Sequence, residues 1–367
     1  MSHSFSRRKF IHNLGLTALT LPILSAVDTC LPKNNKKKLG VALVGLGSYA
    51  EGQLAPALQQ TEHCYLAGIV TGTPSKAGRW KAKYNIPDKN IYTYKTIDNI
   101  SNNNDIDIVY IVLPNSLHAE YCIRASQAGK HVICEKPMAI TVADCDAMIA
   151  ASKNAGKKLS IGYRLHFDEY HKEMMRFGRK QVYGKLKTVN ADFAFHAQSG
   201  IWRLDKELAG GGPLMDLGIY CVQSFCYTTG LEPLAVTAQE GAKTDALKFK
   251  EVEQSLTWQF EMPGGIKCNG KTSYEDSYNN LRAEAENEWF ELSPAFSYNG
   301  IRGKTSQGEM KFTNVNQQAL QMNNFALAII NNRPTPVTGE MGRRDVKYLQ
   351  AIYQAMRTGE RVIIPKD

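Results

Sequence analysis

The apolar run LGVALV (residues 39–44), followed at once by Gly45, limits the fold of this chain more than any other feature. A run without a polar residue is typical of a parallel strand that is buried on both faces. Further apolar strands are expected at 64–72, near Tyr92, and at 106–114, 131–134 and 158–163, with helices between them at 52–60, 75–84, 116–128 and 142–155. This alternation predicts an α/β domain over residues 39–160, a Rossmann fold with a doubly wound parallel sheet.

The pattern changes after Tyr163. Segments with partial alternation of polar and apolar residues follow at 186–195, 234–243, 253–262, 265–274 and 281–292, and Pro263-Gly264-Gly265 predicts a hairpin turn. They indicate an α+β domain over residues 161–367 with a large, mostly antiparallel sheet. One face of that sheet is expected to be solvated or to pair with another subunit, in a homodimer or homotetramer. Closing helices are expected at 317–331 and 345–358, the second with room to pack back on the Rossmann domain.

The net charge of +9 is concentrated at the N-terminus, where residues 1–38 hold seven lysines and arginines against Asp28 alone. The rest of the chain has no basic stripe with interleaved aromatic residues, so nucleic acid is not an expected partner. Eight cysteines occur without a CxxC pair. We therefore expect mostly buried free thiols and no metal site.

An export signal is expected in residues 1–38, followed by a polar linker. Ser6-Arg7-Arg8-Lys9-Phe10 precedes an apolar run from Leu14 to Val27, which is too short to span a membrane and ends in small residues. The arginine pair followed by Phe10 is typical of a twin-arginine signal, which predicts a periplasmic protein. The alternatives are a chance arginine pair in a cytoplasmic extension, or lipidation at Cys30.

The segment GLGSYA is the first motif that carries chemistry, because it follows a strand and precedes a helix. Glycines at these places allow a tight turn and a close approach of the backbone to a pyrophosphate at the helix N-terminus. The alternative is an ordinary strand–helix turn. The predicted cofactor-binding residues of this turn are Gly45, Leu46, Gly47, Ser48, Tyr49 and Ala50.

The end of the second strand bears on the choice of dinucleotide. NAD usually requires an acidic residue there to accept hydrogen bonds from the ribose hydroxyls. This chain has Thr71, Gly72 and Thr73 instead, with Lys76 and Arg79 just beyond. Hydroxyls and cations suit a 2′-phosphate, so NADP is expected, with NAD as the alternative. The alternative for Lys76 and Arg79 is a solvated helix face.

Two further segments supply candidate catalytic residues. Lys136, in Glu135-Lys136-Pro137, comes directly after an apolar strand, at the edge where parallel sheets bind their ligands. In GGGPLMDLGIY, Pro213 suits the first turn of a helix, and Asp216 and Tyr220 lie four residues apart on one helix face. A nearby lysine cation would favour the phenolate and make Tyr220 usable as an acid or base. The alternative is a buried tyrosine that hydrogen-bonds a buried aspartate.

These motifs resemble the glucose–fructose oxidoreductase/inositol dehydrogenase/rhizopine-catabolism (Gfo/Idh/MocA) family. The segments that carry the resemblance are GLGSYA, VYIVLPNSLHAEYCIRASQAGKHVICEKPMA, KKLSIGYRLHFD and WRLDKELAGGGPLMDLGIY. Many members carry histidine where Tyr220 stands, and tyrosine marks the glucose–fructose oxidoreductase branch, which this chain resembles most.

The resemblance implies a tightly held NADP and a sugar substrate: an aldose is oxidised to a lactone and a ketose is reduced to an alditol. It implies that Tyr220 is the acid/base, that Lys136 assists it and holds the reacting hydroxyl, and that Asp216 orients the sugar. It also implies a nicotinamide crevice lined by Leu113, Pro114, Asn115 and His118, with Glu135 near the nicotinamide ribose. It further implies that four residues close over the cofactor and the substrate: Tyr163, Arg164, Trp202 and Arg203. Of these, Tyr163 would contact the substrate.

Two alternatives stay open within the family. The segment between Val27 and Leu39 is short and lysine-rich, whereas the glucose–fructose oxidoreductase branch is known for a long proline-rich arm that wraps a partner's cofactor. A simple NAD(P)-dependent aldose, inositol or anhydrosugar dehydrogenase with an exchangeable cofactor is therefore the second interpretation. The third, of another class, is an exported NAD-dependent glycosidase.

Overall fold

The structure is a computed structural model that describes residues 38–366. The expected export signal with its arginine pair, and Cys30, lie outside the described residues. Within them, no helix combines the length and the apolar character needed to cross a bilayer.

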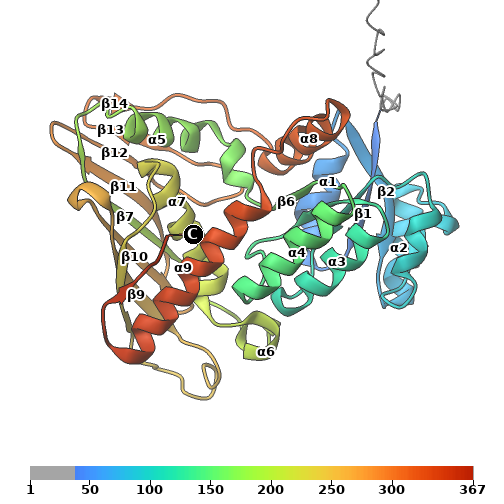
Figure 1. Cartoon of the computed structure of the whole chain (residues 1–367), viewed down its shortest axis with the longest axis horizontal. Coiled ribbons are helices and arrows are strands. Elements are labelled where there is room, and N and C mark those ends of the chain that lie inside the picture. Colours follow the sequence, from blue (N-terminus) through green and yellow to red (C-terminus); the bar gives the residue numbers. More distant parts are fainter. Residues whose placement is uncertain (1–37, 367) are drawn as a thin grey trace, which may run out of the picture. The chain divides into compact units, whose positions relative to one another are not determined.

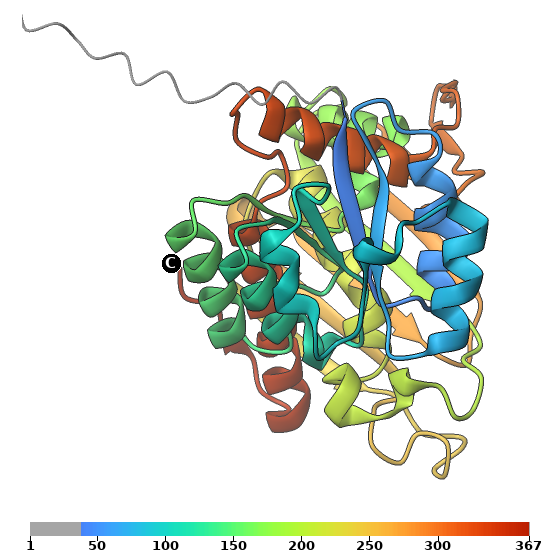
Figure 2. The ribbon, with the colours of Figure 1, turned by 90° about the vertical axis from the view of Figure 1, so that its right-hand side faces the viewer.

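The first sheet is the predicted doubly wound parallel sheet (Figures 1 and 2). Its strand order is β3-β2-β1-β4-β5-β6, and every pair in it is parallel. The strands are β1 (Leu39–Val44), β2 (Cys64–Val70), β3 (Ile91–Tyr92), β4 (Ile108–Ile111), β5 (His131–Cys134) and β6 (Leu159–Ile161). The order reverses between β1 and β4, so the carboxyl ends of these two strands open a crevice for ligands.

Helices cover both faces of this sheet, as the apolar strands require (Figure 2). On one face, α3 (His118–Gln127) and α4 (Val142–Asn154) pack in the same buried cluster as Val109. The other face carries a π-helical turn (Ala50–Leu54) that continues as α1 (Ala55–Leu58), then α2 (Pro74–Tyr84) and, from the far end of the chain, α8 (Gln317–Ile330).

The second sheet has the order β14-β13-β12-β11-β7-β10-β9-β8-β15. Its strands are β7 (Leu186–Ala194), β8 (Ala235–Glu240), β9 (Ser255–Glu261), β10 (Lys267–Ser273), β11 (Tyr278–Ala285), β12 (Trp289–Leu292), β13 (Gly303–Thr305), β14 (Gly308–Glu309) and β15 (Val362–Ile363). All pairs are antiparallel except β7 with β10, so the predicted mostly antiparallel sheet is confirmed.

Three helices pack on one face of this sheet: α5 (Glu169–Arg179), α7 (Ile219–Thr229) and α9 (Gly339–Thr358) (Figure 1). For example, the ring centre of Trp258 in β9 lies 6.4 Å from the ring centre of Phe225 in α7. At its other end α9 reaches the first sheet's helices, where Arg343 Nε lies 2.5 Å from Asp146 Oδ1 of α4.

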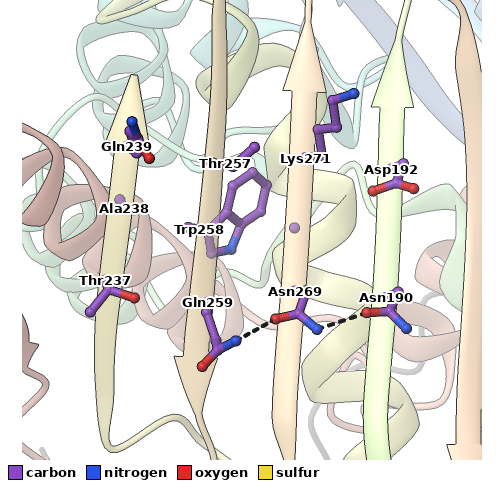
Figure 3. Close-up of a pocket in the computed structure, with 11 residues that line it drawn as sticks. Asn190, Asp192, Thr237, Ala238, Gln239, Thr257, Trp258, Gln259, Asn269 and Lys271 are labelled. Carbon is purple, nitrogen blue, oxygen red and sulfur yellow. Dashed lines mark hydrogen bonds between the residues drawn. The ribbon is translucent and has the colours of Figure 1, made fainter. Parts of the chain in front are cut away.

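The opposite face of this sheet is polar (Figure 3). Side chains alternate along a strand, so the neighbours of Trp258 point away from α7. One row runs across four strands from Thr237 through Gln259 and Asn269 to Asn190. Gln259 donates to Asn269 over 2.7 Å, and Asn269 donates to Asn190 over 2.8 Å. This face was expected to be solvated or to pair with another subunit, and polar side chains, amides among them, line it.

Three elements differ from the sequence expectations. The segment 281–292 contains two strands, β11 and β12, because the chain reverses at Glu286–Glu288. Helix α9 begins at Gly339 rather than near Asp345, since Thr338 accepts a hydrogen bond from Met341 N and so caps it earlier. The expected helix after Pro213 opens with a π-helical turn, Leu214–Gly218, and runs on as α7.

The cysteines of residues 38–366 are all buried and unpaired. No group of three or more potential metal ligands was found in that part of the chain.

Candidate active site

The glycine turn after β1 combines one crowded and one open glycine. Gly45 has a φ of +96°, and a Cβ there would lie 2.3 Å from the Val112 carbonyl oxygen, so only glycine fits. A Cβ at Gly47 would meet nothing within 4 Å. Since Ala50 starts the helical stretch, the turn places free space at a helix N-terminus, where a phosphate is favoured.

A lysine reaches this turn from the helix that follows the second strand. Lys76 of α2 donates from Nζ to the Leu46 carbonyl oxygen over 3.1 Å, so its positive charge lies at the turn. Arg79 instead pairs with Glu51 over 3.0 Å on the exposed helix surface. Thr71 is buried, and its hydroxyl accepts from Thr73 N, while Gly72 and Thr73 are exposed. The structure thus brings Lys76, but not Arg79, to the predicted phosphate turn.

Lys136 lies just beyond β5, as expected, and its ammonium meets the helix that begins after Pro213. Its Nζ donates to the Asp216 carbonyl oxygen over 2.7 Å and lies 3.2 Å from Asp216 Oδ1. The same ammonium lies 4.6 Å from the centre of the Tyr220 ring. Lys136, Asp216 and Tyr220, the three predicted catalytic residues, therefore converge at one point.

Asp216 is held ionised. Burial raises the pKa of its carboxyl group, but Lys136 and Arg203 outweigh burial and lower that pKa to about 2. Arg203 Nε lies 2.9 Å from Asp216 Oδ2, and its guanidinium lies 4.7 Å from the Trp202 ring. Tyr274, which follows β10, donates its hydroxyl to the same Oδ2 over 3.3 Å. Sequence reasoning missed Tyr274, because no spacing links β10 to a helix some sixty residues earlier in the chain.

The three glycines before this helix form a closed structural turn. Gly210 has a φ of +78° and ends the short helix α6 (Lys206–Ala209). Cβ atoms at Gly211 and Gly212 would lie 2.0 Å from the Tyr353 hydroxyl and 2.5 Å from the Glu253 carbonyl oxygen. The Glu253 carboxylate accepts from Gly212 N (3.0 Å) and Leu214 N (3.1 Å). The helix start is therefore occupied by the chain's own carboxylate, another contact that the sequence did not reveal.

The residues predicted to line the nicotinamide crevice follow the end of β4. Leu113 and Pro114 are half-buried there, and Asn115 is buried and donates from Nδ2 to the Ala209 carbonyl oxygen over 2.8 Å. This hydrogen bond connects the loop after β4 to the turn that precedes Asp216.

His118 lies beneath the crevice rather than on its surface. It has no exposed surface, and each ring nitrogen lies 2.9 Å from a backbone carbonyl oxygen, that of Pro137 for Nδ1 and that of Leu113 for Nε2. Burial lowers the pKa of the imidazole. The side chain connects the loops after β4 and β5 and offers no exposed atom to a ligand.

Glu135 is fixed by a chain of hydrogen bonds from α8. Gln321 donates to the Tyr110 hydroxyl over 2.7 Å, and Tyr110 donates to Glu135 Oε1 over 2.6 Å. Burial raises the pKa of Glu135. A Cβ at Gly162 would lie 2.6 Å from Oε1, so glycine is needed beside this carboxyl group. Gln321 belongs to no recognisable motif, so its helix was predicted but its contact with the site was not.

Arg164 enters the cluster, whereas Tyr163 does not. Arg164 is buried, with its guanidinium carbon 5.3 Å from the Tyr220 ring centre, and it donates to Gln317 Oε1. Tyr163 is 2% exposed and lies beside Asp345 of α9 and Tyr227 of α7, in the core behind the site. The expected contact of Tyr163 with substrate is thus corrected: a 3-10 helix begins at Arg164, and the side chain of Tyr163, the residue before it, is directed into the core.

The arrangement places two cations and a carboxylate around one phenol, next to a turn with room for phosphate. Such a site can hold a polyol through the carboxylate and transfer a proton through the phenol.

Comparisons with known proteins agree with this fold. Residues 39–163 match the family model described as "Oxidoreductase family, NAD-binding Rossmann fold" (Gfo/Idh/MocA), and residues 171–291 match the "GFO/IDH/MocA C-terminal domain". A solved structure, aldose-aldose oxidoreductase from Caulobacter crescentus complexed with glycerol, is 41% identical with a TM-score of 0.87, covering 89% of this chain and 99% of that one.

Two curated relatives are more distant. D-xylose 1-dehydrogenase [NADP(+)] of Haloarcula marismortui is 25% identical over 338 residues, covering 88% of this chain and 92% of the relative. D-glucoside 3-dehydrogenase of Escherichia coli is 26% identical over 277 residues, covering 70% and 79%. With both domains matched and a 41% identical relative covered almost end to end, this chain is an oxidoreductase with an NAD(P)-binding Rossmann fold and belongs to the Gfo/Idh/MocA family.

Proposed function

We propose that this oxidoreductase transfers a hydride between sugars, oxidising an aldose at C1 to a lactone and reducing a second sugar carbonyl to an alditol. The observation that carries the proposal is the convergence of Lys136, Asp216 and Tyr220 at the carboxyl end of β5. The 41% identical relative is named for a reaction between two aldoses, which supports an aldose as acceptor. The glucose–fructose pairing expected from the resemblance differs only in using a ketose as acceptor.

The residues of the glycine turn fit the pyrophosphate of a dinucleotide, because Gly47 borders open space at a helix N-terminus. The turn residues 45–50 would hold it, and the crevice residues Leu113, Pro114 and Asn115 would lie at its nicotinamide end together with Glu135, Arg164, Trp202 and Arg203. The lack of an acid at 71–73, with hydroxyls and Lys76 in its place, favours NADP over NAD, because these groups suit a 2′-phosphate. When bound, the nicotinamide supplies the group that takes up and returns the hydride.

Tyr220 would accept the proton from the donor C1 hydroxyl and return it to the carbonyl oxygen of the acceptor. The donor loses one hydride and one proton and the acceptor gains one of each, so the paired reactions leave no net redox change. Lys136 would hold the reacting hydroxyl, and its charge beside the Tyr220 ring would compensate negative charge that develops on the phenol oxygen. Asp216, ionised at neutral pH, would accept hydrogen bonds from neighbouring sugar hydroxyls.

The decisive experiment purifies the protein without added cofactor and denatures a portion to look for NADP in the supernatant. Native protein then receives glucose with either fructose or a second aldose. Lactone and alditol formed without added cofactor support the proposal. Turnover only with added NADP would favour the exchangeable dehydrogenase, and cleavage of aryl glycosides without sugar exchange would favour the glycosidase.

A site test compares two tyrosines of one helix. Tyr220→Phe should abolish sugar turnover and leave cofactor content unchanged, because it removes only the phenol oxygen. Tyr227→Phe is the matched control: its hydroxyl faces Met341 Sδ at 3.4 Å, away from the cluster, so turnover should persist. Unchanged turnover in Tyr220→Phe would remove this residue from the mechanism.

We also propose that the protein is exported to the periplasm through the arginine pair Arg7–Arg8. Replacing both arginines by lysine should leave the protein in the cytoplasm, as judged by cell fractionation; periplasmic protein in that variant would count against the signal.

A homodimer or homotetramer formed through the polar face in Figure 3 is likewise proposed, since that face bears exposed and half-buried amides. Light scattering of the wild type and of Gln259→Glu would test it.

A further inference from the structure

The loop between β12 and β13 reaches the glycine turn of the other sheet. Its backbone is fixed before it arrives: Asn279 Oδ1 accepts from Ala295 N (2.9 Å) and Phe296 N (2.7 Å). Arg164 donates to the carbonyl oxygens of Phe296 (2.5 Å) and Ser297 (3.0 Å). The next residue, Tyr298, is therefore presented from a rigid support.

Tyr298 stacks on a residue of the glycine turn itself. The ring centres of Tyr298 and Tyr49 lie 5.7 Å apart with an interplanar angle of 29°, and the Arg164 guanidinium carbon lies 4.5 Å from the Tyr298 ring centre. Tyr298 is nevertheless 44% exposed. A large aromatic side chain that is held on two sides yet faces solvent is not explained by core packing.

The pair connects the glycine turn to the loop that contacts the catalytic cluster. Tyr49 belongs to the turn, and the loop that carries Tyr298 also places Phe296 against Tyr220, with ring centres 5.9 Å apart. Burial raises the pKa of the Tyr49 phenol, as does the nearby charge of Glu135. A ligand that extends from the turn to Lys136 would lie beside this pair, since one ring belongs to the turn and the other to the loop that contacts Tyr220.

We infer that Tyr298 and Tyr49 form a clasp that closes over a dinucleotide bound between the glycine turn and the Lys136–Tyr220 cluster and slows its release. This inference rests on the proposed function only in requiring a bound dinucleotide. Loss of the stacked ring and of its contact with the adjacent cation should change the rate of release about tenfold, or about 1.4 kcal/mol. Because the pair must separate before a bound dinucleotide can leave, its loss should appear in the rate of release.

The test measures release of NADPH by the loss of its fluorescence when loaded protein is mixed with excess NADP. Tyr298→Ala should release NADPH about tenfold faster than wild type, while Tyr298→Phe, which keeps the ring, should release it at the wild-type rate. Phe312→Ala is the matched control, since Phe312 is also an exposed aromatic but packs on Tyr170. It should leave release unchanged. The double variant Tyr49→Leu/Tyr298→Ala should release little faster than Tyr298→Ala, because both changes remove one contact.

An unchanged release rate in Tyr298→Ala would overturn the inference. So would tighter binding of NADPH by that variant, which would mean that the pair obstructs the site. Thermal unfolding of each variant checks that the fold is kept. Sugar turnover is assayed separately, so a protein that binds NADPH behind the clasp but exchanges no hydride between sugars would contradict the proposed function alone.

Discussion

Two glycine-rich turns lead into helices in this molecule, and they differ in what fills the space at the helix start. Beside Gly47 that space is open, whereas at Gly211 and Gly212 it is taken by Tyr353 and Glu253. Both turns present backbone N–H groups where negative charge is favoured. The second turn satisfies them with the Glu253 carboxylate. A glycine-rich turn is thus a ligand site only where the chain leaves the anion's place empty.

The largest effect is expected from a methyl group in the closed turn. Gly212→Ala should lower the free energy of unfolding by about 3 kcal/mol, because the new Cβ would press on the Glu253 backbone, which cannot move aside cheaply. Urea denaturation followed by circular dichroism measures this. Gly47→Ala is the matched variant and should change stability by less than about 0.5 kcal/mol. Equal losses in the two variants would remove the distinction between the turns.

The second largest effect is expected from removing the negative charge of the Glu253 carboxylate. Glu253→Gln should lower the free energy of unfolding by about 2 kcal/mol, because an amide has only one acceptor oxygen for the N–H groups of Gly212 and Leu214. Glu309→Gln, at an exposed position, is the control and should have no measurable effect. If the two variants unfold at the same urea concentration, Glu253 does not stabilise the helix start.

As pH falls, the contributions of Asp216 and Glu253 to the free energy of unfolding should change in opposite directions. The folded-state pKa of Asp216 lies at about 2, below its ordinary value of 3.8, so the unfolded chain binds the proton first as pH falls. The stabilisation, about 2 kcal/mol, is present above pH 4 and is lost as pH falls to 2. Asp216→Asn should lack this loss.

Burial raises the pKa of Glu253, so the stability difference between wild type and Glu253→Gln should grow in favour of wild type as pH falls. Urea midpoints measured at several acidic pH values give both slopes. Parallel slopes for the two variants would contradict these assignments.

The smallest effect concerns the open turn. Gly47→Ala should weaken NADPH binding about fivefold, or about 1 kcal/mol, because the added methyl group occupies space that the phosphate would use. Fluorescence titration measures the affinity, with Gly78→Ala in α2, where a Cβ also meets nothing, as the control. Unchanged affinity in Gly47→Ala would place the phosphate elsewhere.

Local patterns predicted most of the fold. The uninterrupted apolar runs of β1 and β4 and the turn at Pro263 identify structure because the signal lies within a few residues. Helix α5 was not predicted, although its residues Glu169–Arg179 follow a capping aspartate, Asp168. The parallel pairing of β7 with β10 had no local signal, since the two strands are far apart in the chain.

The candidate site divides in the same way. Lys136, Asp216 and Tyr220 were predictable, because a strand end and a helix face determine where such side chains point. Tyr274, Glu253 and Gln321 contact the site through tertiary packing alone, and nothing in their immediate neighbours distinguishes them. Tyr163 was misplaced for the converse reason: its neighbour Arg164 faces the site, and proximity in sequence does not determine direction.

The larger buried cluster runs without a break from Val109 and Val132 of the first sheet to Val189 and Phe260 of the second. The halves that match separate family models are therefore not interchangeable parts. A chimera that exchanged residues 39–163 for those of a relative would have to recombine inside a shared interior, where side-chain volumes on both sides must agree. Recombination should succeed best among relatives that keep both halves of this cluster, and substitutions in either half should be felt in the other.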